Sequence, residues 1–425
     1  MSDNHIPNHC ASSSHSHPHP PTHSHDESSA YPPAGSSDIG DIYTVLSSYH
    51  CYRRLAHLSL THTRRQTFYA LPLSQQNLLS APPISFLDTL NSLDEAVSNN
   101  ADLADAIFEV SVDCFGADME VCRDPRFGKL PNADEMEKVR STLKQFYRDW
   151  SAEGEEERKA AYGPVKDELS RRFGEHSYEE KHSISILVPG AGLARLAFDL
   201  AVLGYTCQGN EHSFHQLMAS NYILNFSPSA NCHTLHPWCH TFSNHRTRSG
   251  QLKGVTIPDV HPASLLRSAG DRFSMAAGSF VREYNTPESK ATFDVVATVF
   301  FIDTAVNVVD YLYTIWNALK PGGVWINTGP LLWHWEGREV VRDPGDEDAD
   351  GGEKVKGVEL TVEEVLVLAE KIGFKVERKG RMDRGEYVGA GEESMLKYVY
   401  EGEYWVAVKE GVEKEVKEEE NDLFE

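Results

Sequence analysis

The sequence predicts an α/β fold with a mostly parallel sheet, preceded by a helical N-terminal region. Three observations support this prediction. From His182 onward, apolar strand-like runs alternate with amphipathic helix-like runs, which is typical of a parallel sheet covered by helices on both faces. A glycine turn at residues 190–192 directly follows the first of these strand-like runs. Over residues 38–173, apolar residues recur every three or four positions, the spacing of a helix with one buried face.

Composition divides the chain into four parts. Residues 1–37 hold seven of the 20 histidines among Ser and Pro, so they have little apolar surface to bury and we expect a disordered tail. A helical region over 38–175 and an α/β domain over 176–409 follow. An acidic tail over 410–425 ends the sequence, and we expect it to be disordered. The acidic stretch at 343–357 is typical of a solvated loop.

The α/β domain is predicted to contain strands and helices in alternation. The predicted strands are SISILVPG (183–190), YTCQGNE (205–211), a short one within FSMAAGSF (273–280), FDVVATVFFID (293–303) and GVWINTGP (323–330). The predicted helices are LARLAFDLAVLG (193–204), SFHQLMASNYILN (213–225), AVNVVDYLYTIWNALKPG (305–322) and TVEEVLVLAEKIGF (361–374). Two last strands, at 375–380 and 395–410, are separated by a connection too short for a crossover helix. They predict an antiparallel hairpin at the sheet edge.

Charge and cysteine content exclude several classes of partner. The formal net charge of −24 argues against nucleic acid or an anionic membrane, which are bound by clustered Lys and Arg. No apolar stretch approaches the roughly 18–20 residues needed to span a bilayer. The seven cysteines show no CxxC pair, as expected in a reducing compartment. We expect a cytoplasmic protein with a small neutral or cationic substrate, and the sequence leaves a nuclear location and a homodimer open.

A metal site is the one alternative suggested by a local cluster. The segment CHTLHPWCH (232–240) brings together two cysteines and three histidines. Their order fits no common zinc-finger spacing. We therefore expect no metal.

The glycine turn indicates which cofactor the domain binds. A dinucleotide fingerprint has a third glycine where this sequence has Arg195, and a dinucleotide requires room for its pyrophosphate. S-adenosylmethionine has no phosphate, so Arg195 conflicts less with that cofactor. Glu211 follows Gly192 by 19 residues, where a carboxylate can accept both ribose hydroxyls of either cofactor. The turn LKPGG (319–323) resembles one in class I methyltransferases, and together the three signals favour an S-adenosylmethionine-dependent methyltransferase.

A closer resemblance covers roughly residues 136–408. It rests on the segments QFYRDWS, ILVPGAGLARLA, LGYTCQGNEHSF, PWCHTFSN, IPDVHPASL, FFIDTAVNVVDY, LKPGGVWINTGPLL and MLKYVYE. They resemble the carnosine N-methyltransferase family, and several lie outside the generic cofactor fold. The resemblance implies a class I methyltransferase fold and transfer of a methyl group from S-adenosylmethionine to an imidazole nitrogen of carnosine, giving anserine.

The resemblance also implies site residues, position by position. The implied cofactor-binding residues are Gln145, Arg148, Gly190, Glu211 and Phe280, together with Ser279, where the family has Asp, and Val299, where it has Cys. The implied substrate-binding residues are Asp303, Tyr311, His334, Tyr387, Tyr398 and Tyr400. Tyr387 is the loosest match, because the loop around it differs in length. Both departures, Ser279 and Val299, lie in the implied adenine pocket.

Asp303 and His334 are the candidate catalytic residues. If Asp303 accepts the N–H of one imidazole nitrogen, the lone pair of the other nitrogen is directed at the methyl group, and the carboxylate stabilises the growing positive charge. His334 would orient the ring or remove the proton afterwards.

Each of these residues also has a purely structural interpretation. Asp303 is placed to cap the next helix, and His334 to pack between two tryptophans. Tyr398 and Tyr400, on one face of the last strand, are placed to pack a sheet, and Arg148 to be a surface charge. Two other functions remain open as well: methylation of histidine in a peptide or protein, and a non-catalytic S-adenosylmethionine-binding protein that uses its acidic tails for a partner.

Overall fold

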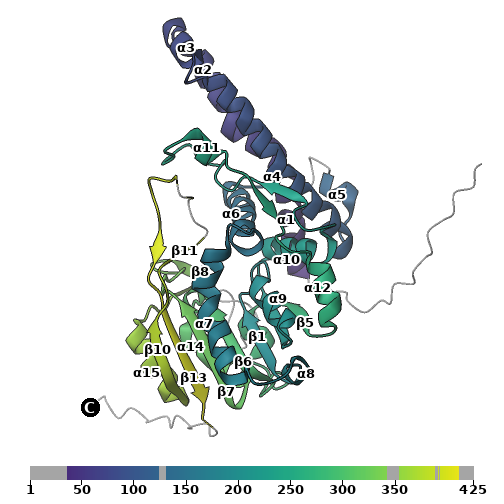
Figure 1. The fold of residues 1–425 in the computed structure, drawn as a ribbon, viewed down its shortest axis with the longest axis vertical. Coiled ribbons are helices and arrows are strands. Elements are labelled where there is room, and N and C mark those ends of the chain that lie inside the picture. The colour runs from purple at the N-terminus through teal and green to yellow at the C-terminus, as the bar shows by residue number, and fades with distance from the viewer. Residues whose placement is uncertain (1–35, 124–130, 342–353, 388–390, 392, 411–425) are drawn as a thin grey trace, which may run out of the picture.

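The computed structural model describes residues 36–123, 131–341, 354–387, 391 and 393–410 (Figure 1). At its centre lies a seven-stranded sheet with the order β5-β2-β1-β6-β7-β13-β10. In chain order these strands are β1 (Ser185–Pro189), β2 (Thr206–Glu211), β5 (Phe273–Ala277), β6 (Phe293–Val299), β7 (Leu319–Gly329), β10 (Phe374–Arg381) and β13 (Glu403–Lys409). Each strand that the sequence predicts for the α/β domain therefore has a counterpart in this sheet, although not always with the predicted bounds.

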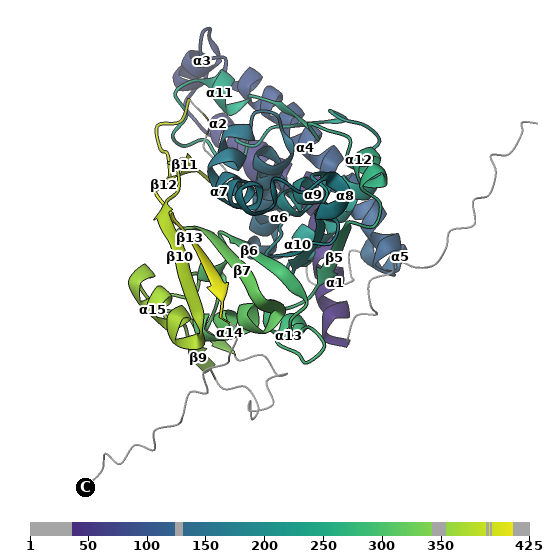
Figure 2. The ribbon, with the colours of Figure 1, turned by 60° about the horizontal axis from the view of Figure 1, so that its bottom comes forward.

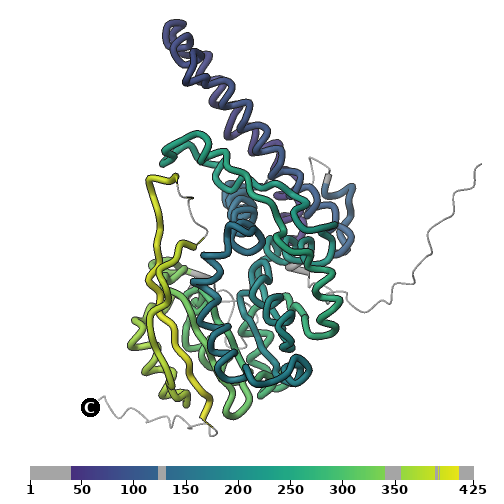
Figure 3. The backbone as a smooth tube through the Cα atoms, in the orientation of Figure 1, coloured from purple at the N-terminus to yellow at the C-terminus, as the bar shows by residue number. Residues whose placement is uncertain are grey.

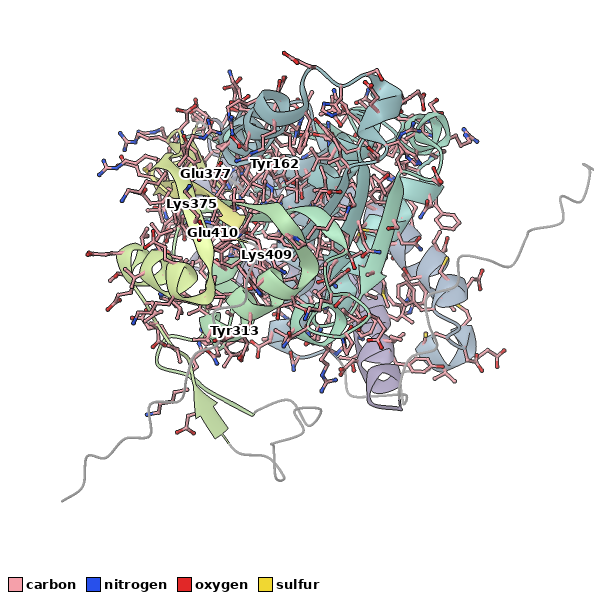
Figure 4. All side chains as sticks on the ribbon, turned by 90° about the horizontal axis from the view of Figure 1, so that it is seen from below. Tyr162, Tyr313, Lys375, Glu377, Lys409 and Glu410 are labelled. Carbon is pink, nitrogen blue, oxygen red and sulfur yellow. The ribbon has the colours of Figure 1, made fainter. Side chains whose placement is uncertain are left out.

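The sheet is parallel except at one end. Strands β5, β2, β1, β6 and β7 pair in parallel, whereas β13 runs antiparallel to both β7 and β10. This confirms the predicted mostly parallel sheet with a terminal antiparallel hairpin. The hairpin is not simply added at the edge, because β13 inserts between β7 and β10. Lys409 lies at the end of β13 (Figure 4). Its Nζ donates to the carbonyls of Trp316 and Leu319, at 2.6 and 2.8 Å.

Helices cover both faces of the sheet (Figure 2). They are α9 (Arg195–Val202), α10 (Phe214–Asn221), α13 (Phe280–Tyr284), α14 (Val308–Ala318) and α15 (Val362–Ile372), with a π-helical turn η2 (Tyr222–Phe226) after α10. Successive residues of β1 serve opposite faces, as strand geometry requires. Leu187 packs with α14 and α15, whereas Ile186 and Val188 pack with α9 and with α7 (Glu155–Phe173).

The N-terminal region is helical, in keeping with its periodicity. It contains α1 (Ser36–His57), η1 (Leu58–His62), α2 (Thr63–Tyr69), α3 (Leu73–Ser80), α4 (Phe86–Cys114), α5 (Met119–Arg123), α6 (Ala133–Trp150), α7 (Glu155–Phe173) and α8 (Tyr178–Lys181). Helices α1 and α4 lie side by side and extend away from the sheet, with α2 and α3 at the tip (Figure 1). Leu46 and Leu93 share one core cluster with Phe198 and Met218 of the α/β part. The helical region is thus joined to the α/β part by a common core.

An insertion after η2 was not anticipated in the sequence. It contains a short hairpin of β3 (His233–Leu235) and β4 (Val255–Ile257), with α11 (Arg248–Gln251) and α12 (Pro262–Ala269). Strand β3 packs against α4. Strands of three residues are too short to show the alternation of apolar and polar residues that identifies a strand in a sequence.

Two sequence predictions need correction. The prediction of a loop at 343–357 is wrong at its end, because β9 (Lys354–Lys356) pairs with β8 (Glu339–Val341). The prediction of one strand over 395–410 is also wrong: β12 (Val399–Tyr400) pairs with β11 (Gly385–Glu386), and β13 begins only at residue 403. The strand is interrupted around Gly402, which packs against the backbone of β7: an added Cβ would lie 2.7 Å from the Gly329 carbonyl carbon. Both predicted tails and the rest of the acidic stretch fall almost entirely outside the described residues.

The segment before β13 leaves the sheet and reaches the insertion. Figure 3 shows it in yellow, running from the sheet toward α11. Its backbone is held there, since Met395 N–H donates to Asn244 O at 2.7 Å and Arg246 N–H donates to Glu393 O at 3.0 Å. In the part of the chain described, none of the helices combines the length and the apolar character needed to cross a bilayer.

Candidate active site

A cavity of about 530 Å³ opens at the carboxyl ends of the central strands. Open α/β sheets bind their ligands at this edge. Twelve of the thirteen sequence-predicted site residues line it, namely Gln145, Arg148, Gly190, Glu211, Ser279, Phe280, Val299, Asp303, Tyr311, His334, Tyr387 and Tyr400. Tyr398 does not line the cavity, and its side chain is 70% exposed. The sequence placed Tyr398 beside Tyr400 on the last strand, and the break before β13 removes both from that strand.

The glycine turn needs its glycines for two different reasons. Gly190 has φ of +63°, and an added Cβ would lie 2.4 Å from Cδ2 of Phe301, so only glycine fits. Gly192 has φ of +58°, but its Cβ would meet nothing within 4 Å. The turn therefore leaves open space beside the backbone at Gly192, where a ligand can approach closely.

Glu211 lies at the end of β2 and is largely occupied by the backbone. Its Oε2 accepts a hydrogen bond from Gly192 N–H, and its Oε1 accepts two more, from His212 and Ser213, all at 2.8 Å. Burial raises the pKa of Glu211, and these three N–H donors counteract the shift. A carboxylate offers about four acceptor positions. The backbone takes three of these positions, and the Gln216 amide lies 3.2 and 3.3 Å from the two oxygens. An incoming hydroxyl must therefore displace Gln216, whereas the sequence led us to expect two open positions.

Helix α6 brings Gln145 and Arg148 to the cavity. Arg148 is only 6% exposed, so the surface-charge interpretation is wrong. Its Nε and Nη2 bind the two carboxylate oxygens of Asp149 at 2.7 and 2.8 Å, and its guanidinium lies 4.3 Å from the centre of the Tyr387 ring. The amides of Gln145 and Gln216 are hydrogen-bonded to each other, and the Gln216 amide also reaches the two carboxylate oxygens of Glu211, at 3.2 and 3.3 Å. Nη1 of Arg148 takes no part in the pair with Asp149, which leaves a cationic donor at the cavity wall.

The opposite wall is apolar. Phe280 is buried and meets Phe301 and Tyr311 edge-on, with ring centres 5.3 Å apart in each case. Ser279 precedes it at the start of α13, and Val299 ends β6. A flat aromatic ligand can enter between such side chains, whereas the side chains of Ser279 and Val299 cannot carry a charge.

Asp303 presents an unpartnered carboxylate oxygen. Its side chain is buried, Oδ2 accepts from Leu332 N–H at 3.0 Å, and Oδ1 has no hydrogen-bond partner among the described residues. Burial raises the pKa of Asp303, against the effects of the Leu332 N–H and of His334. The capping interpretation is wrong, because α14 is capped by Asn307, whose side chain accepts from Val309 N–H. Oδ1 is therefore available to a ligand with an N–H group.

His334 stands at the mouth of the cavity, next to Asp303. Its backbone N–H donates to Asp303 O at 3.0 Å. The flanking tryptophans are the packed residues: Trp333 Nε1 donates to Leu360 O at 3.1 Å and Trp335 Nε1 to Thr304 O at 3.0 Å. His334 itself is exposed. The interpretation of His334 as a packed core histidine is therefore wrong.

Phe300 is a cavity residue that sequence reasoning missed. Its φ is +52°, a left-handed conformation that is strained for a bulky residue. Its ring stacks on Tyr387 with centres 4.4 Å apart and meets Tyr400 edge-on at 5.6 Å. Nothing in the run FFID distinguishes this phenylalanine from an ordinary strand residue, so the sequence carried no signal for it. Together the three rings form an aromatic wall beside the cavity.

The cysteine and histidine segment at 232–240 has a different use. His236 N–H donates to Asn100 Oδ1 at 2.7 Å, and Asn100 Nδ2 donates to Cys239 Sγ at 3.3 Å. His240 Nε2 lies 2.6 Å from the Tyr52 hydroxyl. These side chains join the insertion to helices α1 and α4. Across the described ranges, no group of three or more His, Cys, Asp or Glu is placed to hold a metal.

Comparison with known proteins gives consistent matches. A family model described as carnosine N-methyltransferase matches residues 125–411. The carnosine N-methyltransferase of Schizosaccharomyces pombe is 41% identical over 363 residues, which cover 85% of this chain and 94% of the relative. That of Rattus norvegicus is 38% identical, with 84% of this chain and 83% of the relative covered.

Among solved structures, a glycopeptide N-methyltransferase complexed with sinefungin superposes with a TM-score of 0.32. It is 16% identical, and the match covers 58% of this chain and 93% of that one.

Proposed function

Because the chain belongs to the carnosine N-methyltransferase family, we propose that it transfers a methyl group from S-adenosylmethionine to an imidazole nitrogen of carnosine, giving anserine. The observation that carries this proposal is the buried, unpartnered Oδ1 of Asp303. An anionic acceptor at this point of the cavity matches the N–H of a neutral imidazole. It equally suits the positive charge that develops on the ring as the second nitrogen is methylated.

The chain's own residues fit S-adenosylmethionine. Arg148, with Gln145 beside it, offers a cationic donor for a carboxylate, and Glu211 presents a carboxylate on which a ribose hydroxyl can replace the Gln216 amide. Gly192 leaves open space for close approach of a ligand to the turn. Phe280 provides an apolar face for adenine. We call the part of the cavity lined by Gln145, Arg148, Gly190, Glu211 and Phe280 the cofactor half.

The rest of the cavity suits the imidazole. We call the part lined by Phe300, Asp303, His334, Tyr387 and Tyr400 the substrate half. The bound cofactor supplies an electrophilic methyl group on a sulfonium. Asp303 Oδ1 accepts the N–H of one ring nitrogen, and this bond selects the tautomer whose other nitrogen carries a free lone pair. Its negative charge then stabilises the ring as that ring becomes cationic.

The neighbouring side chains complete this role. The Leu332 N–H on Oδ2 fixes the carboxylate plane, so that Oδ1 is held in one direction. The aromatic wall of Phe300, Tyr387 and Tyr400 excludes water from the ring. His334, at the mouth, is placed to accept the surplus proton and pass it to solvent.

A transfer assay tests this function. The purified protein would be incubated with labelled S-adenosylmethionine and, in separate reactions, with carnosine, homocarnosine, free histidine or a histidine-containing protein. We expect transfer to carnosine, with a product identical to anserine by NMR. Transfer only to the protein would favour the peptide or protein alternative. No transfer to any imidazole, with cofactor binding intact, would favour the non-catalytic alternative and overturn the proposal.

Two further expectations stay predictions. The homodimer is checked by the mass of the protein in solution, and the cytoplasmic and nuclear location by microscopy of a tagged chain. The proposed methylation of a small dipeptide depends neither on a homodimer nor on a particular location in the cell.

A further inference from the structure

The C-terminal end of α6 is held by two arginine side chains and one backbone N–H group from outside the helix. The last carbonyls of a helix have no hydrogen-bond partner within the helix. Here the carbonyls of residues 148–151 each accept a hydrogen bond from outside it. Nη1 of Arg158 donates to the carbonyls of residues 148 and 151, at 2.6 Å each. Nη1 of Arg195 donates to the carbonyl of residue 149 at 2.7 Å, and Asp259 N–H to that of residue 150 at 2.8 Å.

A shared carboxylate joins these groups into one cluster. Asp259 Oδ1 accepts from Arg195 Nη1 at 2.6 Å, and Oδ2 accepts from Arg195 Nη2 and from Arg158 Nη2, both at 3.1 Å. The two arginine side chains are each 9% exposed and the aspartate is 13% exposed. Removing one partner from a buried charge cluster leaves the others uncompensated. The three residues therefore act as a unit.

The same cluster reaches the glycine turn. Arg195 is the first residue of α9, directly after the turn, and its Nε binds Asp199 Oδ1 at 2.8 Å. Its guanidinium lies 4.9 Å from the centre of the Trp150 ring, and Trp150 Nε1 donates to Leu193 O at 3.0 Å. The end of α6 is thus tied to the turn at two points. The residues of α6 that face the cavity, Gln145 and Arg148, lie within its last two turns.

We propose that Arg195, Asp259 and Arg158 form a positioning cluster that holds Gln145 and Arg148 of α6 against the glycine turn and thereby sets the affinity for S-adenosylmethionine. The inference rests on the proposed function for the identity of the ligand. Arg195 occupies the position of the third glycine of a dinucleotide fingerprint. In this fold, the side chain at that position links a helix from outside the α/β domain to the cofactor turn.

Two conservative substitutions test the cluster. Arg195→Lys keeps the charge but loses the two-pronged contact with Asp259, and Asp259→Asn keeps the shape but removes the charge. For each, isothermal titration calorimetry should show S-adenosylmethionine and S-adenosylhomocysteine binding about tenfold more weakly. The KM for carnosine should change less than about twofold, because no member of the cluster lines the substrate half. The double variant should lose little more than the worse single one, since both disrupt one unit.

Arg272→Lys is the matched control. Arg272 is also a buried arginine, 8% exposed, and donates to the carbonyls of Gly204 and Ala269 and to Glu179, but it has no contact with α6. This variant should lower Tm without weakening cofactor binding. A purely structural role of the cluster would show the same pattern for Arg195→Lys and Asp259→Asn, and that result would overturn the proposal.

The calorimetric measurement also separates this proposal from the proposed function. If the protein binds S-adenosylmethionine but transfers no methyl group to carnosine, the proposed function fails, while the comparison of dissociation constants still decides the role of the cluster. If the unsubstituted protein binds no S-adenosylmethionine, both proposals fail.

Discussion

The two halves of the cavity are built in different ways. In the cofactor half, Glu211 already accepts three backbone N–H groups and Arg148 is paired with Asp149. In the substrate half, Asp303 keeps an oxygen that has no partner in the described part of the chain, and His334 is exposed. The first half is fixed by the backbone before any ligand arrives, whereas the second leaves its polar groups for the substrate to satisfy. The two halves should therefore fail differently when altered.

The largest expected effect comes from Asp303→Asn in the substrate half. The amide can still accept a hydrogen bond, but it carries no negative charge to stabilise the methylated ring and can present its NH₂ group instead. We expect the rate of methyl transfer to fall by about 10³-fold. Single-turnover rates would measure this, with calorimetry showing that S-adenosylmethionine binding changes less than about twofold. Full activity in this variant would remove the proposed role of the carboxylate.

In the cofactor half, Gly190→Ala should have the next largest effect. The added Cβ meets the Phe301 ring at 2.4 Å and the residue must keep φ of +63°, so backbone strain and overpacking together cost about 3 kcal/mol of stability. Thermal unfolding and cofactor titration would measure the change. Gly192→Ala is the control, because its Cβ meets nothing within 4 Å and only the strain of about 1–2 kcal/mol remains. Equal losses in the two variants would contradict the role assigned to Phe301.

The contrast between the halves also explains what the sequence predicted. The elements of the cofactor half come from long periodic runs, and a short glycine motif marks their junction, so the sheet and its helices were predicted correctly. The insertion and the β11–β12 ladder are built from strands of two or three residues, too short to show a pattern. Their positions depend on contacts distant in sequence, such as Met395 with Asn244.

Side chains whose roles depend on contacts distant in sequence were also not predictable from the sequence alone. Asp303 could be assigned only through the family resemblance, because an aspartate near a helix start is equally typical of a cap. The structure removes this ambiguity, because Asn307 caps α14 and the Asp303 carboxylate does not. The left-handed backbone of Phe300 has no signature in the residue type. Arg195 stands where a dinucleotide fingerprint has a glycine, but its distant partners, 45 to 64 positions away along the chain, were not predictable from local spacing.

Acid should lower the stability of the fold through His215, which precedes the cavity residue Gln216 on α10. His215 is 3% exposed, near Ser48 and Glu135, and burial lowers its pKa to about 4. Between pH 6.5 and 4 the unfolded chain therefore binds a proton that the folded chain does not. Stability contributed by the neutral ring is present above pH 6.5 and is lost as the pH falls toward 4, by about 3 kcal/mol.

Thermal unfolding across this pH range checks the prediction. His215→Gln should have a flatter dependence of Tm on pH than the unsubstituted protein. His182→Gln, at an exposed histidine outside α10, is the control for the substitution itself. An unaltered slope in His215→Gln would assign the acid sensitivity to another group.

Phe300→Ala should affect the substrate half alone. It removes the ring that stacks on Tyr387 and meets Tyr400, and aromatic pairs are worth about 0.5–1.5 kcal/mol each. We expect the KM for carnosine to rise about tenfold, with cofactor affinity nearly unchanged. Steady-state kinetics with each substrate varied in turn would show this. A larger effect on cofactor binding would mean that the aromatic wall belongs to both halves.

The smallest effect is expected from Tyr398→Ala, and it separates the structure from the sequence. The family resemblance counts Tyr398 among the substrate-binding residues, whereas its side chain is 70% exposed and lies outside the cavity. Kinetic parameters for carnosine should change less than about twofold, because exposed side chains with few contacts contribute little. Tyr400→Ala, two residues on, lines the cavity and meets Phe300, so it should raise the KM severalfold. If Tyr398→Ala proved the more damaging, the chain around β12 would have to change conformation when substrate binds, so that Tyr398 enters the cavity. Tyr398 would then belong to the substrate half.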